Sequence, residues 1–267
     1  MTSSIKKPRI GIVGVGYVGG ALRSYFSKKK FMLFLYDRGK GLGSIKTMDQ
    51  AEIIFLCLPT PFQEPKGYDD SALWEVVKAL TGKKIIVIKS TVLPGTTQAI
   101  QNHYPQHKIL FNPEFLRARS AEEDFSHPER QIVGYTKKSK QIAKYILKIL
   151  PKAPYERSIP ANEAEMVKYF GNVFLSLRVI FANQMYDLCK KIAVDYDQVM
   201  ETAGRDSRVG HSHFDVFHEG YRGYQGNCFP KDVKALIQFA RKSGVPLELI
   251  EKMDRINSKL AAKKSKE

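Results

Sequence analysis

Six short apolar runs occupy the first half of the chain, and amphipathic stretches separate them. A continuous run of Val, Ile, Leu and Phe is typical of a strand that is buried on both faces of a parallel sheet. An alternation of such runs with helical patterns predicts an α/β fold with a doubly wound parallel sheet. The runs are RIGIVG (9–14), FMLFLYD (31–37), EIIFLCLP (52–59), KKIIVIKS (83–90), HKILFNPEF (107–115) and RQIVGY (130–135).

A proline-rich segment, PKAPYERSIP at residues 151–160, interrupts this pattern. We interpret its three prolines as a linker. We therefore expect a first domain of residues 1–157 and a second, mostly helical domain of residues 158–267.

The second domain opens with a helical pattern that runs from about Ala161 to Val194. Apolar residues spaced by three and four predict a long central helix with a buried face. Asn162, followed three residues later by Glu165, predicts the N-cap and its capping partner. The apolar positions are Met166, Phe170, Val173, Phe174, Leu177, Ile180 and Phe181.

The composition restricts the class of protein. A chain of 267 residues with 43% hydrophobic content can build one large core or two smaller ones. No segment reaches the roughly 18 apolar residues of a membrane span, and the start of the chain has no long apolar run. We expect a cytoplasmic protein that does not bind membranes. The net charge of +16 favours polyanionic partners, including nucleotides, but no interleaving of arginine with aromatic residues predicts nucleic-acid binding.

The three cysteines are too few and too scattered for a disulfide framework or a paired metal site. Cys57 lies in a buried-strand pattern and Cys189 in a helical pattern, so we expect both to act as small hydrophobic residues. Only Cys228 has polar neighbours in the sequence. The histidines of the loop at residues 211–218 have no Cys or carboxylate at ligand spacing, so no metal is expected.

A glycine motif follows the first apolar run. Gly14, Gly16 and Gly19 form G-x-G-x-x-G between a predicted strand and a predicted helix, the arrangement of a Rossmann-type turn that receives a dinucleotide pyrophosphate. Asp37 ends the second run, 18 residues after Gly19. This is near the spacing expected for a carboxylate that binds the ribose hydroxyls. A carboxylate there repels a 2′-phosphate, so we expect NAD, although the neighbouring Arg38 weakens that preference.

Seven segments together resemble one family, the UDP-glucose and GDP-mannose 6-dehydrogenases. They occur in the family's order and lie between Ile10 and about Asn257. The DSRVG and CFPKD strings resemble the UDP-glucose 6-dehydrogenase branch more closely. The segments are GVGYVG, CLPTPF, STVLPGTT, FNPEFLRARSAEEDFSHPERQIVG, AEMVKYFGN, GRDSRVG and GNCFPKD.

This resemblance implies a four-electron oxidation in which UDP-glucose becomes UDP-glucuronate and two NAD are reduced. Cys228 resembles the family's nucleophile, which adds to the intermediate aldehyde as a thiohemiacetal and is then oxidised to a thioester. An ammonium group from Lys168 or Lys231 would favour the thiolate.

The remaining roles are also implied by the resemblance. Lys168 and Asn172 resemble the pair that stabilises the oxyanion, and Asp232 the carboxylate that manages a water or proton. Glu114 resembles the base for thioester hydrolysis, and Thr91 the hydroxyl that holds a water. The expected cofactor contacts are Gly14, Gly16, Tyr17, Val18, Gly19, Asp37, Arg38, Thr60, Thr91 and Lys231. The expected substrate contacts are Glu114, Phe115, Leu116, Lys168, Asn172, Arg208 and Gly223.

The sequence also departs from the family pattern. Family members continue beyond the position of Glu267 into a third domain, and Ala118 stands where a second glutamate is usual. Arg222 and Gln225 replace an aromatic residue and a glycine before the cysteine. We expect a homodimer in which Arg208 reaches the substrate of the neighbouring subunit, with the third domain dispensed with or supplied by a separate chain.

Two other functions stay open at this point. One is a non-catalytic NAD-binding or dimerisation protein derived from the family. The other is a simpler 2- or 3-hydroxyacid dehydrogenase, which also pairs a Rossmann domain with a Lys-x-x-x-Asn helix. That chemistry has no use for Cys228.

Overall fold

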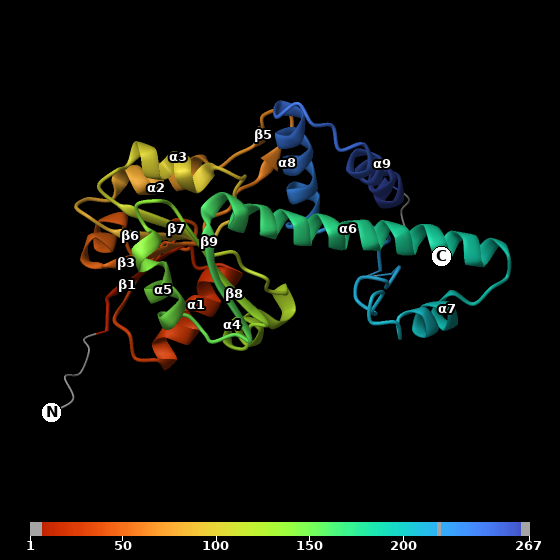
Figure 1. Cartoon of the computed structure of the whole chain (residues 1–267), viewed down its shortest axis with the longest axis horizontal. Helices are drawn as coiled ribbons and strands as arrows, with labels where there is room; N and C mark the ends of the chain where they lie inside the picture. The colour runs from red at the N-terminus through yellow and green to blue at the C-terminus, as the bar shows by residue number, and fades with distance from the viewer. Residues whose placement is uncertain (1–6, 218–219, 263–267) are drawn as a thin grey trace. The chain divides into compact units, whose positions relative to one another are not determined.

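The computed structural model describes residues 7–217 and 220–262 (Figure 1). They form two compact units. The Rossmann unit comprises the residues up to Pro61 together with Tyr68–Lys168, and the helical unit comprises Phe62–Gly67 together with the residues from Tyr169 onward. The expected α/β fold, followed by a mostly helical part with a long helix, is confirmed. The expected domain boundary after residue 157 stays a prediction.

Seven strands build the sheet of the Rossmann unit, in the order β2-β1-β3-β6-β7-β8-β9. Each of the six apolar runs supplies one strand. Neighbouring strands are parallel except β7 and β8, which pair antiparallel, so one pair departs from the expected all-parallel sheet. The strands are β1 (Ile10–Val13), β2 (Leu33–Tyr36), β3 (Ile53–Leu56), β6 (Ile85–Ile88), β7 (Lys108–Phe111), β8 (Arg130–Tyr135) and β9 (Tyr155–Pro160).

Helices cover both faces of this sheet (Figure 1). Alternate strand residues point to opposite faces, so Ile12 packs against one helical layer and Val13 against the other. α2 (Ser71–Ala79) and α3 (Thr96–His103) cover one face. α1 (Tyr17–Lys28), α4 (Ala121–Ser126) and α5 (Lys140–Ile149) cover the other, and two short 3-10 helices, η1 (Ile45–Gln50) and η2 (Ala118–Ser120), lie in the connections.

The predicted linker at residues 151–160 is wrong, because most of it is a strand. β9 pairs in parallel with β8 along its whole length, from Tyr155 opposite Arg130 to Pro160 opposite Tyr135. β9 is the edge strand of the sheet. Proline is tolerated on an edge strand and at a strand end, since no neighbouring strand needs its missing N–H.

The long helix α6 (Ala161–Lys191) is present, but neither residue of its predicted N-terminal cap has that role. It begins at Ala161, so Asn162 is not its N-cap. Glu165 does not cap it either, because its carboxylate accepts hydrogen bonds from the Gly95 and Thr97 N–H groups at the start of α3. Its apolar face is also only partly buried: Val173 and Ile180 are buried, whereas Met166, Phe170, Phe174 and Phe181 are exposed.

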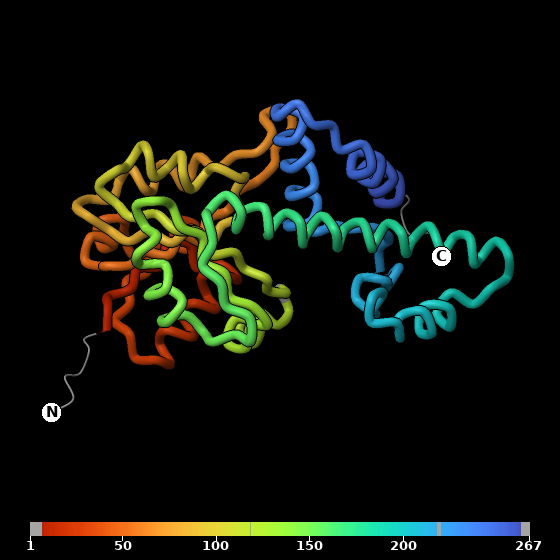
Figure 2. Tube along the Cα trace, in the orientation of Figure 1, coloured from red at the N-terminus to blue at the C-terminus, as the bar shows by residue number. Residues whose placement is uncertain are grey.

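The described residues of the helical unit form the remainder of α6, three further helices and part of a two-stranded sheet. A small core of Ala182, Cys189, Tyr196, Phe214 and Val216 joins α6, α7 and the loop that follows. β4 lies beside α8 (Figure 2). Lys234 of α8 forms an ion pair with Glu64, the residue after β4. The elements are α7 (Tyr196–Ala203), α8 (Phe229–Lys242), α9 (Glu248–Ala262), β4 (Phe62–Gln63) and β5 (Gly67–Tyr68).

Candidate active site

The glycine turn connects β1 to α1 and has the geometry that a dinucleotide requires. Gly14 has a φ of +85°, and a side chain on it would collide with the Cys57 carbonyl oxygen. A side chain on Gly19 would collide with the Gly14 carbonyl oxygen, whereas nothing lies near the position of a Cβ on Gly16. The open approach at Gly16 leads to the N-terminus of α1, which begins at Tyr17 and has no acidic residue in its first turn. These residues fit a bound pyrophosphate.

Asp37 lies directly after β2 and is fixed to this turn. Its Oδ2 accepts a hydrogen bond of 2.7 Å from the Val15 N–H, and its Oδ1 accepts one of 3.0 Å from the Lys40 N–H. The Val15 bond is the main cause of a lowered Asp37 pKa, so the carboxylate is ionised at neutral pH. Each oxygen keeps a further lone pair for a ribose hydroxyl. Sequence reasoning missed Lys40, whose Nζ donates to the Val15 carbonyl at 2.5 Å.

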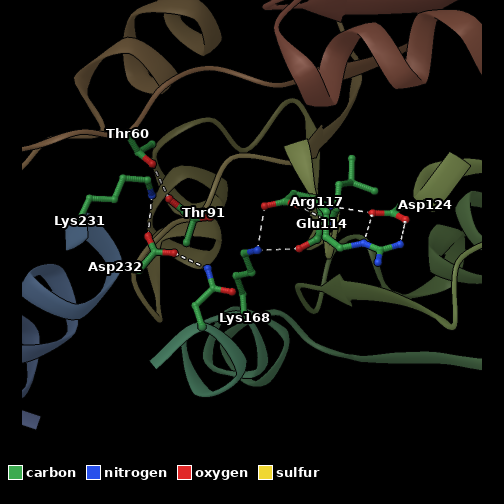
Figure 3. A network of polar contacts seen from close by, with 10 residues as sticks. Thr60, Thr91, Glu114, Arg117, Asp124, Lys168, Lys231 and Asp232 are labelled. Atoms are coloured by element: carbon green, nitrogen blue, oxygen red, sulfur yellow. Dashed lines mark hydrogen bonds and ion pairs between the residues drawn. The ribbon is translucent and has the colours of Figure 1, made fainter. Parts of the chain in front are cut away.

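Two predicted hydroxyl residues lie together in the Rossmann unit. Thr60 is buried, and its Oγ1 donates a 2.7 Å hydrogen bond to the Thr91 carbonyl (Figure 3). The Tyr68 hydroxyl donates to the same carbonyl at 3.3 Å. The backbone at Thr91 is therefore fixed from two sides.

Glu114 and Lys168 form a nearly buried ion pair, also in the Rossmann unit (Figure 3). The Lys168 Nζ lies 2.8 Å from Glu114 Oε1 and donates to the Glu114 carbonyl at 2.8 Å, while the Leu116 N–H donates to Glu114 Oε2 at 2.8 Å. The Phe115 ring centroid is 5.8 Å from the same ammonium. Burial alone raises the Glu114 pKa, but the Lys168 charge and these hydrogen bonds outweigh it, so the pKa is lowered. The structure thus gathers Glu114, Phe115 and Leu116 around Lys168.

A second lysine beside this pair was not predicted. The Lys89 side chain is only 3% exposed, and its Nζ donates to Asn112 Oδ1 at 2.8 Å. Burial lowers the Lys89 pKa to about 8. Burial also raises the pKa of the Cys57 thiol to about 12, although the Lys89 charge opposes the shift. Cys57 was expected to act as a small hydrophobic residue, and the structure places the charges of Lys89 and Glu114 near it. The sequence did contain a signal for this residue, because Lys89 stands at the end of the apolar run at residues 83–90.

The helical unit holds the other predicted catalytic residues. Cys228 is the exposed N-cap residue of α8, and its carbonyl accepts the Asp232 N–H at 3.0 Å. The Asp232 carboxylate is 1% exposed and accepts hydrogen bonds of 2.6 Å from both Asn172 Nδ2 and Lys231 Nζ. The Lys231 ammonium is thus engaged by Asp232 (Figure 3). Asn172 lies on α6 one turn beyond Lys168, on the same face of that helix.

The two remaining substrate candidates lie in the loop region before Cys228. The Arg208 side chain is 87% exposed, and its guanidinium donates to both carboxylate oxygens of Asp206. Gly223 has a φ of +75° and packs against the Asn257 side chain. Neither contact tests their predicted substrate role.

Among the described residues there is neither a metal-binding cluster nor a helix that could span a membrane. Within residues 7–217 and 220–262, no three His, Cys, Asp or Glu side chains are grouped so as to hold a metal ion. His218 of the predicted solvated loop lies outside these ranges. No helix in the same ranges combines the length and apolarity needed to cross a bilayer.

Together, the fold, the glycine turn and the Asp37 carboxylate beside it are typical of a dinucleotide-binding α/β protein with an appended helical unit. Residues 42–150 match the NAD binding domain of the UDP-glucose/GDP-mannose dehydrogenase family, and residues 162–259 match the central domain of that family. The chain belongs to this family, and its cofactor is NAD.

Curated relatives agree with this assignment. The chain is 33% identical over 222 residues to UDP-glucose 6-dehydrogenase TuaD of Bacillus subtilis, covering 78% of this chain and 47% of the relative. It is 30% identical over 223 residues to UDP-glucose 6-dehydrogenase of Rhizobium meliloti, covering 78% of this chain and 50% of the relative. The chain spans about half the length of these relatives.

Solved structures show the same fold. A UDP-glucose dehydrogenase from Pyrobaculum islandicum matches with a TM-score of 0.86 and 26% identity over 97% of this chain and 70% of that one. The 3-hydroxyisobutyrate dehydrogenase of Mycobacterium tuberculosis matches with a TM-score of 0.75 and 13% identity over 97% of this chain and 96% of that one. At 13% identity, the second match shows the fold alone.

Proposed function

We propose that this chain is an NAD-dependent nucleotide-sugar 6-dehydrogenase with UDP-glucose as its substrate. The observation that carries the proposal is the match to both domains of the family, in order, by a chain that retains Lys168, Asn172, Cys228 and Asp232. The names of the relatives support UDP-glucose over other nucleotide sugars.

The proposed reaction uses Cys228 as a covalent catalyst. NAD, when bound, would accept a hydride from C6 of the sugar in each of two oxidations. Between them, the Cys228 Sγ bonds to the aldehyde carbon and the carbonyl oxygen takes up a proton, which gives a thiohemiacetal. The second oxidation removes the C6 hydride and the hydroxyl proton and leaves a thioester. Water then attacks the thioester, the thiolate of Cys228 leaves, and the product is the carboxylate.

The contacts within each unit support the proposed roles of the other residues. The lowered pKa keeps Glu114 ionised at neutral pH, which is the form that a base for the hydrolytic water needs. The Lys168 ammonium and the Asn172 amide are donors suited to an oxyanion at C6. Asp232 holds the Asn172 amide at 2.6 Å, which orients that donor.

We also propose that the enzyme is a homodimer. Phe170, Phe174 and Phe181 are spaced by four and seven residues, so they share one face of α6, and Phe170 is 73% exposed. A second copy of the chain would cover this aromatic face. The Arg208 side chain is exposed, so it could reach a neighbouring subunit. The cytoplasmic location stays a prediction.

The first test is the yield of NADH per UDP-glucose consumed by the purified protein. About two NADH are expected, because an alcohol is carried to an acid through Cys228. The Cys228→Ser variant should not release the acid, whereas Cys189→Ser, at a buried cysteine of the same unit, should keep the wild-type yield.

Other outcomes separate the alternatives. NADH formed only when a separate third-domain chain is added would show that a partner completes the site. NADH formed from a 3-hydroxyacid, with Cys228→Ser fully active, would replace the proposal with the simpler dehydrogenase. NAD binding with no turnover under any of these conditions would favour the non-catalytic protein.

A further inference from the structure

The loop that precedes Cys228 is held by the last helix through one asparagine. The Tyr224 N–H donates to Asn257 Oδ1 at 2.7 Å, and Asn257 Nδ2 donates to the Tyr224 carbonyl at 2.9 Å. The side-chain amide thus pairs with both polar groups of one backbone residue, as a neighbouring strand would. Asn257 is buried, so an unmatched donor or acceptor in this pair would lose its hydrogen bond without gaining water.

A second contact reinforces the first. The Tyr224 hydroxyl donates to Asp254 Oδ1 at 3.0 Å, and Asp254 lies three residues before Asn257, on the same face of α9. Tyr224 is buried, and its ring meets the Phe229 ring at 6.4 Å between centroids. Phe229 is the residue after Cys228, so the loop is anchored both before and after the thiol.

Gly223 explains why the loop can approach α9 so closely. Its φ of +75° is a conformation that side-chain-bearing residues rarely adopt, and a Cβ there would collide with Asn257 Oδ1. Gly223 is therefore required by the contact with Asn257, independently of any contact with substrate. Tyr224, Asp254, Asn257 and Gly223 are called the α9 clamp below.

We propose that Asn257 is a positioning residue for Cys228: through the α9 clamp it fixes the loop that sets the thiol at the N-terminus of α8. The inference deepens the proposed function, because it concerns the nucleophile of that reaction. Only three residues separate the clamped Tyr224 from Cys228, and one of them, Gly226, has a φ of +76°. Such a short connection can transmit a shift at Tyr224 to Cys228.

The identity of the residue follows from the two hydrogen bonds. Only a primary amide offers one acceptor and one donor in the spacing of a peptide group. A carboxylate at this position would keep the acceptor for the Tyr224 N–H, but it would present a second acceptor to the Tyr224 carbonyl. Asn257→Asp therefore breaks one half of the pair with almost no change of shape.

The test measures the reactivity of Cys228 without substrate or cofactor. Alkylation by iodoacetamide is followed from pH 6 to 10 by mass analysis of the Cys228 peptide in the full chain. The thiol is already exposed, so release of the loop should act through the thiolate and not through access. We expect Asn257→Asp and Gly223→Ala each to lower the Cys228 rate at pH 7 by about two- to fivefold, the factor that corresponds to losing the interaction of a thiolate with a helix N-terminus. The midpoint of the pH profile should rise in both.

A matched control separates the clamp from backbone strain. Gly220 also has a positive φ, +80°, but nothing lies near the position of a Cβ on it. Gly220→Ala should keep the wild-type rate and midpoint. Tyr224→Phe removes only the Asp254 bond and should give a smaller shift in the same direction, which provides a readout if the stronger variants do not fold.

Two results would overturn the proposal. One is a wild-type Cys228 profile in folded Asn257→Asp, Gly223→Ala and Tyr224→Phe variants. The other is an equal change in Gly220→Ala. Because the assay needs no turnover, failure of the proposed dehydrogenase activity would leave this result unaffected.

Discussion

Glu165 provides the sharpest prediction about stability. Its side chain is 0% exposed, and its two carboxylate oxygens accept the Gly95 N–H at 2.6 Å and the Thr97 N–H at 2.8 Å. These bonds join the start of α3 to α6. Burial raises the Glu165 pKa to about 7, although the two N–H groups oppose the shift. We would replace Glu165 by glutamine, because Glu165→Gln keeps the shape of the side chain and removes the ionisable group.

The expected effect depends on pH because the folded chain holds this proton more tightly than the unfolded chain. Between the ordinary pKa of 4.5 and the raised value, the unfolded chain has released the proton and the folded chain has kept it. The contribution to stability is therefore complete below pH 4.5 and is lost as the pH rises through 7. At about 1.4 kcal/mol per pKa unit, the loss is about 3 kcal/mol.

The variant responds differently. Glutamine can accept only one of the two N–H groups, and leaving the other unmatched costs about 1–3 kcal/mol at every pH. Wild type should therefore be the more stable protein at pH 4.5. Its advantage should shrink by about 3 kcal/mol by pH 8, where the variant should equal or exceed it.

The assay is urea denaturation of both proteins at intervals from pH 4.5 to 8.5. Groups that titrate equally in wild type and variant contribute equally to both unfolding free energies, so their contributions cancel in the difference. Glu163→Gln, at an exposed position in the first turn of the same helix, is the control and should show no pH-dependent difference. If the difference in unfolding free energy between wild type and Glu165→Gln stays constant, or grows as the pH rises, burial does not raise the Glu165 pKa in the folded chain.

Three further predictions concern the site and the assembly. Asp37→Asn should raise the Kd for NAD by about tenfold or more, since charged hydrogen bonds to the ribose are lost; calorimetry measures it, and an unchanged Kd would exclude the ribose contact. Iodoacetamide at pH 8 should label Cys228 and leave Cys57 unmodified, because burial raises the Cys57 pKa to about 12; comparable labelling in a peptide digest would contradict this. Phe174→Glu should convert a dimer into a monomer by light scattering, whereas an unchanged molar mass would mean that this face of α6 is not the interface.

The sheet and the glycine turn were predictable because local sequence determines them. An apolar run such as Ile53–Leu56 can bury both faces only inside a covered sheet, and it became the buried strand β3. The glycine motif was informative because part of it has a local reason: Gly14 has a positive φ, and a side chain on Gly19 would collide with the Gly14 carbonyl five residues earlier.

The errors arose where tertiary contacts overrode a local signal. Prolines predicted a linker at residues 151–160, but an edge strand tolerates proline at its end, and pairing with β8 stabilises Tyr155–Pro160 as a strand. The spacing of Asn162 and Glu165 matched a capping box, yet the carboxylate found stronger partners at the N-terminus of another helix, where the N–H groups also lacked a partner.

The residues that support the candidate site share a property that hid them from sequence reasoning. Glu165 binds Gly95 across 70 residues of chain, and Asn257 binds Tyr224 across 33. Glu165 lies in the AEMVKYFGN segment and Asn257 lies outside the seven segments, but in neither case does the local sequence identify the backbone segment that the side chain holds. A polar side chain that is fully buried must find such a partner, because its burial without one is too costly. Variants of Glu165 and Asn257 should therefore disturb the backbone at Gly95 and at Tyr224 respectively, although neither side chain touches a reacting atom.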